Sequence, residues 1–472
     1  MRIILLIILA LTVNLSFGQA ESRENRIVTE KFVENYNNDD YKAIFSMFAE
    51  VMQNALPIDK TNEFIKGLKL QAGNITKQEF LKYKNGTFAS YKTTFERAIF
   101  SMNISIDDNS KINGLFFKPF IEETNSENVI NNLSTKYLDV TREQTEIIFE
   151  KIKSFPNNTI VSIAIIKEGI VSYYGVNKLN DTIITVNNEK SVFEIGSISK
   201  VFTSTLLANL VIDKKVKLKE NINDYLKIPF NDDIKISFIS LANHTSGIPR
   251  LPTNLDLTKV DINNPYKTYD EQALKEYLTK DLELSNKGEY QYSNLGAGLL
   301  GYTLSQIEKS TYENLLQNKI FSKYSMQNST SDISKVKGNL VKGLDAKGNE
   351  IQNWEFSILK GAGGILSTTE DLSKFAIVHF ECSNKELKLT RKKTNKVSNN
   401  MNIGLGWHLM KSESKNIWNW HNGATGGYLS SMAIDTKTKN GIIILSNVSP
   451  VNPKMGNIDK LCFELMKTLK EK

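Results

Sequence analysis

A serine and a lysine three positions apart stand at the start of a long apolar segment. Ser197 and Lys200 lie in the octapeptide FEIGSISK, which runs directly into VFTSTLLANLVI. Residues three apart on a helix share a face, so the hydroxyl and the amine would point into one space. The backbone N–H of Ser197, unpaired at the helix start, could bind the oxyanion that develops when a nucleophile attacks a carbonyl. The alternative is a capping serine followed by a solvated lysine.

The Ser-x-x-Lys spacing is not unique in this lysine-rich chain. Ser334 and Ser412 also begin such a tetrapeptide, but they lie in polar sequence typical of loops. Ser357 begins another, just before a glycine loop. Gly196 permits a tight turn before Ser197, and the apolar run behind it predicts a buried helix. This context favours Ser197 over the other three serines.

A second candidate group is Tyr292-Ser293-Asn294, within YQYSNLGAGLLGY. The small residues at positions 296–298 let another element approach closely, as expected of a loop that leads into a packed helix. Tyr-x-Asn is a weak signal by itself, because it also begins at Tyr36, Tyr83 and Tyr312. Packing alone is therefore the alternative for Tyr292.

A third candidate group is His421-Asn422-Gly423. The His-x-Gly pattern occurs only once in the chain. It stands at the start of an expected strand hairpin. A histidine on a strand edge can donate to a substrate carbonyl or carboxylate, and the neighbouring glycines let a substrate backbone lie against the strand. A histidine packed in the core is the alternative.

The chain of 472 residues is long enough for more than one domain. Residues 1–18 have the layout of a secretory signal peptide: Arg2 precedes an apolar run from Ile3 to Val13, and small residues at Ser16 and Gly18 frame a cleavage site. The run is too short to span a bilayer, and a buried strand is the alternative. We therefore expect an exported protein, periplasmic or secreted, with no transmembrane anchor after cleavage.

Residues 21–120 predict a small α+β domain. A helical stripe that includes Val28, Phe32 and Tyr36 comes first, and strands follow, with Asn85-Gly86 as a hairpin turn. This pattern resembles the cone-shaped domains of the nuclear-transport-factor and cystatin-like group. The polar stretch 121–143 indicates a linker.

Residues 144–472 differ in character. NTIVSIAIIKEGIVSYYGV predicts two strands joined at Lys167-Glu168-Gly169, and GYLSSMAIDTKTKNGIIILSNVS predicts two more near the end of the chain. Strands at both ends of the segment, with helices between and after them, predict an α+β fold with one antiparallel sheet covered by helices. The loop-rich middle would form a helical subdomain, and the cleft between the two is the expected place for a site.

Composition argues against several classes of function. The net charge is +7, but the lysines are scattered, and no stripe of basic and aromatic residues predicts binding of nucleic acid. Cys462 falls on the apolar face of a C-terminal helix and Cys382 lies in polar sequence, so a disulfide between them is not favoured. We expect neither a metal nor another cofactor, because no metal-ligand spacing links the four histidines, His244, His379, His408 and His421. The oligomeric state is left open.

In chain order, Ser197-x-x-Lys200, Tyr292-x-Asn294 and His421-x-Gly423 resemble the three signature elements of the class C β-lactamase and penicillin-binding serine hydrolases. That family also holds D-alanyl-D-alanine carboxypeptidases, D-aminopeptidases and some esterases. The resemblance covers roughly residue 160 to the C-terminus and implies a β-lactamase/transpeptidase-like fold. Three further segments are similar to the family, namely NHTSGIP from Asn243, GAGGILSTTEDLSKF from Gly361 and GLGW from Gly404.

The resemblance implies a role for each residue. Ser197 is the nucleophile, and Lys200, kept partly neutral by burial, takes or relays its proton with Tyr292. Asn294 holds Lys200 and the substrate amide. His421 binds the acidic end of the substrate or passes a proton through Tyr292. The oxyanion and substrate-binding group consists of Ser197, Gly423 and Ala424, with the backbone N–H groups of Ser197 and Ala424 as the donors.

One departure from the family pattern concerns His421. The β-lactamases of this class carry lysine there, whose permanent charge suits a drug carboxylate, whereas histidine is familiar in the carboxypeptidases and aminopeptidases. We therefore expect an exported serine hydrolase that forms an acyl-enzyme with peptidoglycan-derived D-amino-acid peptides or with small esters or amides. The alternatives are a β-lactamase, a non-catalytic sensor of muropeptides or penicillin, and a protein whose N-terminal unit serves as an interaction module.

Overall fold

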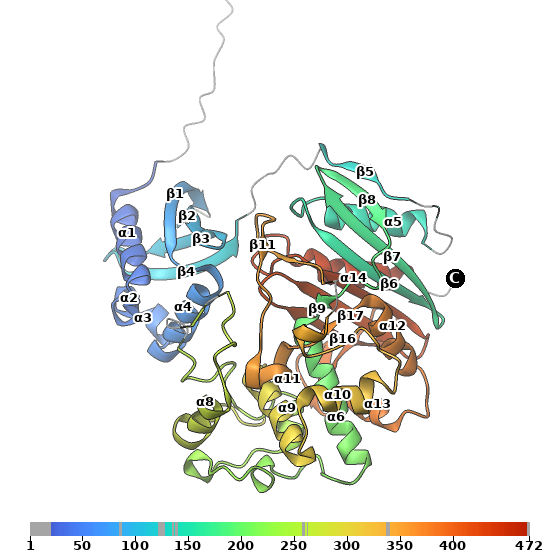
Figure 1. Cartoon of the computed structure of the whole chain (residues 1–472). Coiled ribbons are helices and arrows are strands. Elements are labelled where there is room, and N and C mark those ends of the chain that lie inside the picture. The colour runs from blue at the N-terminus through green and yellow to red at the C-terminus, as the bar shows by residue number, and fades with distance from the viewer. Residues whose placement is uncertain are drawn as a thin grey trace, which may run out of the picture. The chain divides into compact units, whose positions relative to one another are not determined.

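The computed structural model describes residues 20–84, 87–120, 128–134, 136, 140–256, 260–261, 263–336 and 340–469. The chain divides into two compact units, residues 1–120 and 121–472 (Figure 1). The expected signal peptide and the turn at Asn85-Gly86 lie outside the described residues. In the part of the chain that is described, no helix combines the length and the apolar character needed to cross a membrane.

The first unit is the small α+β domain expected from the sequence. Its four strands form an antiparallel sheet in the order β1-β2-β3-β4. Aromatic contacts join helix α1 to the sheet: the ring of Tyr36 meets that of Phe95 edge-on at 5.8 Å, and Phe32 lies 6.3 Å from Phe117. The elements are α1 (Arg23–Asn37), α2 (Tyr41–Met47), α3 (Glu50–Ala55), α4 (Ile58–Ala72), β1 (Ile75–Lys84), β2 (Phe88–Phe95), β3 (Ile99–Ile106) and β4 (Ile112–Pro119).

The second unit is built on a ten-stranded sheet. Its strand order is β13-β14-β15-β16-β17-β18-β6-β7-β8-β5. The expectation that distant parts of the chain share one sheet is confirmed, because β18 near the C-terminus pairs with β6, with Ile443 opposite Ala164. The strands are β5 (Ile130–Asn132), β6 (Ile160–Lys167), β7 (Ile170–Leu179), β8 (Thr182–Val186), β13 (Asn395–Lys396), β14 (Met401–Ile403), β15 (His408–Lys411), β16 (Ile417–Ala424), β17 (Leu429–Asp435) and β18 (Asn440–Ser446).

Strand β5 lies within the stretch 121–143 that the sequence indicates as a linker. It runs parallel to β8, with Ile130 opposite Thr182, and the N–H of Ser134 donates to Thr185 Oγ1 at 2.8 Å. All three side chains of β5 are exposed. An edge strand held by backbone hydrogen bonds needs no apolar pattern, so the polar sequence gives no sign of it.

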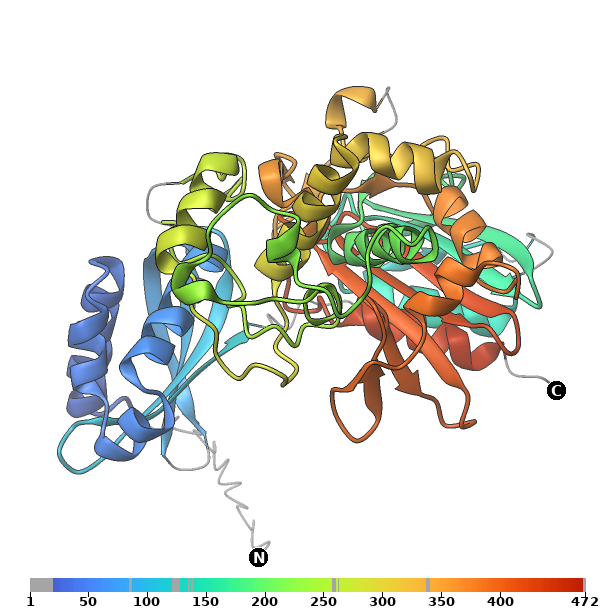
Figure 2. The same ribbon diagram turned by 90° about the horizontal axis from the view of Figure 1, so that it is seen from below.

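Helices cover both faces of the large sheet and form a hydrophobic core with each face. Alternate residues of β6 point into one core or the other. Ile163 and Ile165 pack with the helices α5 (Arg142–Ile152) and α14 (Asn457–Thr468), whereas Ala164 and Ile166 pack with the helical layer on the opposite face. Figure 2 shows α14, in red, on the side of the sheet opposite to the green and gold helices. The opposite layer contains α6 (Ser199–Ile212), α7 (Phe238–Ala242), α8 (Glu271–Glu276), α9 (Asn294–Glu308), α10 (Tyr312–Leu316), α11 (Lys360–Gly363), α12 (Thr369–Val378) and α13 (Lys385–Thr390).

Helix α6 is the central element of this helical layer. Its sequence is apolar all round, as expected of a helix that is surrounded by protein, and most of its residues are buried. A single 3₁₀ turn, η2 (Gly196–Ile198), leads into it. Because α6 is held on every side, the residues at its start have fixed positions beside the sheet.

Both cysteines are free thiols, with Cys382 exposed and Cys462 buried on α14.

Candidate active site

Ser197 lies in η2 at the entry to α6, and Lys200 lies in the first turn of that helix. Lys200 Nζ is 2.9 Å from Ser197 Oγ, so the structure brings the two side chains together as the spacing predicts. Gly196 has φ +50, and a Cβ at that residue would lie 2.6 Å from the backbone nitrogen of Ala424. Only glycine therefore allows η2 to approach the end of β16 this closely.

Lys200 is buried, and its three hydrogen-bond partners are all uncharged. Besides Ser197, Nζ donates to Asn294 Oδ1 at 2.9 Å and to the carbonyl oxygen of Ala362 at 2.6 Å. Burial holds the pKa of Lys200 well below its usual range, and the positive charge of Arg250 lowers it further. The amine is therefore poised to be neutral, which is the form that can accept a proton.

Tyr292 and Asn294 stand at the start of helix α9. Ser293 caps this helix through a bond from the N–H of Gly296 to its Oγ, at 2.8 Å, which places Asn294 in the first turn. The ring centroid of Tyr292 lies 4.8 Å from Lys200 Nζ. Burial raises the pKa of Tyr292 to about 12, although an interaction with Ser197 opposes this rise. The phenol is thus a neutral group beside both Ser197 and Lys200.

The last residues of β16 form the opposite wall of the site. Strand β15 pairs with β16 only as far as His408 opposite Trp420, so residues 421–424 extend beyond this partner. A Cβ at Gly423 would lie 2.9 Å from the backbone nitrogen of Ser197 and would overlap the carbonyl oxygen of Ile195. The nitrogens of Ser197 and Ala424 therefore come close to each other where η2 meets β16.

His421 is buried, with its two ring nitrogens in different surroundings. Nδ1 lies 2.6 Å from the carbonyl oxygen of Asn422, an acceptor only, which assigns the proton to Nδ1. Burial, together with the nearby His408 and Lys200, holds the pKa of His421 well below its usual range. His421 is therefore a neutral imidazole in which Nε2 can accept a hydrogen bond.

A cavity of about 250 Å³ opens beside these groups. Ser197 and Tyr292 line it on one side, and Gly423 and Ala424 of β16 on another. The cavity joins the candidate nucleophile to the candidate oxyanion donors, so an acyl group could reach both.

The sequence profile of the Beta-lactamase family matches residues 159–462, which is well over half of the chain. The chain belongs to the beta-lactamase family. Within that family, 24% of 258 aligned residues are identical to a beta-lactamase of Pseudomonas fluorescens, across 53% of this chain and 69% of that protein. The D-alanyl-D-alanine-carboxypeptidase/endopeptidase AmpH of Escherichia coli is 24% identical over 283 residues, which are 55% of this chain and 72% of the relative. A beta-lactamase of Providencia stuartii is 25% identical over 247 residues, with 51% and 61% covered.

Solved structures support the family fold. The octameric penicillin-binding protein homologue from Pyrococcus abyssi superposes with a TM-score of 0.59 at 22% identity, covering 69% of this chain and 77% of that one. The beta-lactamase/D-alanine carboxypeptidase from Pseudomonas syringae gives 0.57 at 20% identity, covering 70% and 98%. The chain is thus a serine hydrolase of the beta-lactamase family with the expected β-lactamase/transpeptidase-like fold. Residues 29–115 match a separate family of proteins of unknown function, DUF3887.

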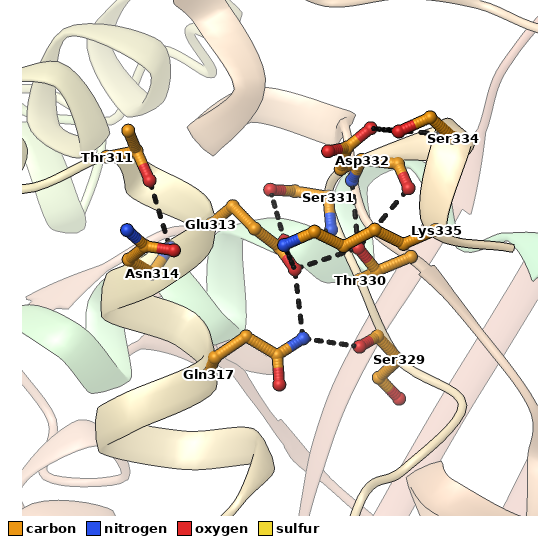
Figure 3. A network of polar contacts seen from close by, with 10 residues as sticks. All are labelled: Thr311, Glu313, Asn314, Gln317, Ser329, Thr330, Ser331, Asp332, Ser334 and Lys335. Atoms are coloured by element: carbon orange, nitrogen blue, oxygen red, sulfur yellow. Dashed lines mark hydrogen bonds and ion pairs between the residues drawn. The ribbon is translucent and has the colours of Figure 1, made fainter.

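The three other serines of Ser-x-x-Lys spacing have different surroundings in this beta-lactamase-family chain. Ser334 is exposed in a single 3₁₀ turn, and its hydroxyl donates to Asp332 Oδ1 at 2.6 Å (Figure 3). The adjacent Lys335 reaches the carboxylate of Glu313 at 3.3 Å. Ser412 also lies in an exposed turn, 2.9 Å from the hydroxyl of Ser414. Ser357 has φ +42 at the start of a short 3₁₀ turn that precedes α11.

Several residues at the site are not among those that the sequence predicts to form it. The hydroxyl of Tyr266 accepts from Asn294 Nδ2 at 3.2 Å, and Tyr266 comes from an irregular loop. His244 Nδ1 accepts from the N–H of Ser293 at 3.2 Å, and its ring lies 4.6 Å from that of Tyr292. His408 lies 2.8 Å from the hydroxyl of Tyr290. His244 lies in the NHTSGIP segment, so the family resemblance could have pointed to it.

Proposed function

We propose that Ser197 attacks the carbonyl carbon of a peptide, amide or ester and forms an acyl-enzyme. The contacts of Lys200 carry this proposal. When the amine is neutral, Asn294 Oδ1 and the Ala362 carbonyl accept its two N–H groups, and its lone pair is left for the Ser197 hydroxyl 2.9 Å away. The hydroxyl proton passes to Nζ as Oγ forms the new bond to carbon.

The backbone N–H groups of Ser197 and Ala424 bind the oxyanion of the tetrahedral intermediate in this proposal. Their closeness at the junction of η2 and β16 supports the pairing. When the carbon–oxygen or carbon–nitrogen bond to the leaving group breaks, that group takes the proton from Lys200, directly or through Tyr292. Water then attacks the acyl-enzyme by the same steps in reverse, and Ser197 recovers its proton.

His421 acts in this scheme as a neutral hydrogen-bond acceptor. Its Nε2 is buried and has no partner among the described residues, and its ring centroid lies 6.4 Å from that of Tyr292. A donor of the substrate, or the Tyr292 hydroxyl after a small movement, could fill that position. This role differs from the carboxylate binding that the resemblance implies for a charged histidine.

D-amino-acid peptides of the cell wall and small esters or amides are the proposed substrates, and the AmpH relative supports the peptide class by its name. Several relatives are named as beta-lactamases, which makes β-lactam hydrolysis a second candidate. The neutral His421 argues against β-lactam hydrolysis, since the carboxylate of the drug would meet no positive charge at that residue. The layout of residues 1–18 supports export to the periplasm or the medium.

Steady-state hydrolysis of three substrates tests the proposal: p-nitrophenyl acetate, nitrocefin and an acetylated D-alanyl-D-alanine peptide. The wild type, Ser197→Ala and Lys200→Met are compared, with far-ultraviolet circular dichroism to verify folding. We expect turnover of the ester or the peptide in the wild type and a loss of about 10³-fold or more in both variants, as for removal of a nucleophile or its base. Turnover that is independent of Ser197 would contradict the proposal, and covalent capture without turnover would favour a sensor.

A further inference from the structure

Arg250 places an exposed guanidinium on the wall of the active-site cavity. Its Cζ lies 5.2 Å from the ring centroid of Tyr292, the residue that adjoins Ser197 and Lys200. Among the residues that the structure describes, neither an ion pair nor a hydrogen bond joins the Arg250 side chain to another side chain. A positive charge without a counter-charge therefore lines the same cavity as the candidate nucleophile.

The backbone of Arg250 is fixed to the start of α9. Its carbonyl oxygen accepts from the N–H groups of Asn294 and Leu295, both at 3.1 Å. The preceding residue is held as well, because Ser293 Oγ donates to the Pro249 carbonyl at 2.7 Å. These bonds connect the loop to the start of α9 and hold the backbone of Arg250 beside the site, and the contact with the Tyr292 ring places the guanidinium at the cavity.

Among the described residues that line the cavity, Arg250 is the one with a positively charged side chain. His421 is neutral, and the next residue, Asn422, donates from Nδ2 to Asp459 Oδ2 on α14 at 2.8 Å. Asp459 also lines the cavity, and burial raises its pKa. A substrate carboxylate would find no favourable charge interaction with Asp459. The planar guanidinium of Arg250, in contrast, can bind a carboxylate through two parallel hydrogen bonds.

We propose that Arg250 binds a carboxylate of the substrate and thereby selects acyl donors that carry an anionic group close to the scissile carbonyl. This inference rests on the proposed acyl-enzyme at Ser197 and names the substrate class of that site. Arg250 thus takes the place of the cation that His421 does not supply. It is a specificity-determining residue, because its planar fork matches the geometry of a carboxylate.

Two matched pairs of esters test the inference on the full-length protein. One pair, p-nitrophenyl hydrogen glutarate and p-nitrophenyl butyrate, differs in a carboxylate on the acyl side. The other pair, 3-acetoxybenzoate and phenyl acetate, differs in a carboxylate on the leaving group. The quantity compared is the ratio of kcat/KM within each pair, because Arg250 also influences Lys200 and every substrate shares that effect.

For Arg250→Gln we expect the ratio of at least one pair to fall by about 10- to 100-fold, the effect of losing a charge-assisted hydrogen bond. The pair that responds identifies the side that carries the anion. Arg250→Lys, which keeps the charge without the fork, should fall between the wild type and Arg250→Gln. Arg23→Gln, at an exposed arginine of α1, is the matched control and should leave both ratios unchanged.

The outcomes separate the inference from the function on which it rests. Hydrolysis that depends on Ser197, with both ratios unchanged in Arg250→Gln, would overturn the inference and leave the proposed function intact. Hydrolysis that Ser197→Ala does not reduce would overturn the proposed function, and the inference with it.

Discussion

Replacement of Gly423 by alanine should disable the oxyanion donors without unfolding the protein. A Cβ at this position would lie 2.9 Å from the nitrogen of Ser197 and 2.5 Å from Ser430 Oγ, and it would overlap the Ile195 carbonyl. Because two of these atoms belong to the backbone, a change of rotamer cannot relieve the contact. Ordinary contacts between carbon atoms are about 3.5–4 Å, so β16 and η2 must separate by roughly 1 Å.

The expected cost follows from that displacement. A misplacement of about 1 Å at reacting groups lowers the rate by about 10²-fold, and loss of an oxyanion donor by about 10²–10³-fold. We expect kcat for p-nitrophenyl acetate to fall within this range, together with about 1–3 kcal/mol of unfolding free energy from overpacking. Gly67→Ala is the matched control, because a Cβ at this position in α4 meets no atom within 4 Å. A kcat for Gly423→Ala within about threefold of the wild type would refute the placement of the donors.

Two titrations and one truncation give further tests. The kcat/KM for a neutral ester should decrease as pH falls through the lowered pKa of Lys200, because the protonated amine cannot act as a base. In Arg250→Gln this decrease should begin at higher pH, since the positive charge that lowers the pKa of Lys200 is gone. Activity on a carboxylate-bearing peptide should show no step near pH 6.5 attributable to His421, whose pKa lies well below that value, and a step that His421→Gln removes would contradict this. A chain that begins at residue 121 should retain most ester turnover. It should also melt at a higher temperature than a chain that begins at residue 138, because the shorter chain lacks β5. A folded but inactive 121–472 chain would show that the first unit completes the site.

The sequence was sufficient to predict the two α+β units and the sheet built from distant strands, because each depends on local apolar patterns and turn residues. Strands β6 and β7 are β-branched, apolar-rich runs on either side of Glu168 and Gly169, both of which have positive φ, as a tight hairpin turn requires. The helix after Ser197 was predictable for the same reason. The apolar run needs burial on every side, and α6 receives it.

Contacts between distant loops could not be predicted in this way. Tyr266, Ala362 and Arg250 reach the site from three irregular or short elements, and no periodic pattern relates them to Ser197. The neutral state of His421 is also a product of the fold, because its burial and its bond to Asn422 set its charge. The sequence predicted which residue types would form the candidate site, whereas their charge states depend on packing.

The site of acylation is the most direct test of the mechanism. Intact-protein mass spectrometry after brief exposure to a fluorophosphonate or to benzylpenicillin, followed by peptide mapping, identifies the residue that carries the adduct. We predict a single adduct on Ser197, absent in Ser197→Ala and unaffected by Ser357→Ala. An adduct that survives in Ser197→Ala and maps to Ser357, or to any other residue, would contradict the assignment of Ser197 as the nucleophile.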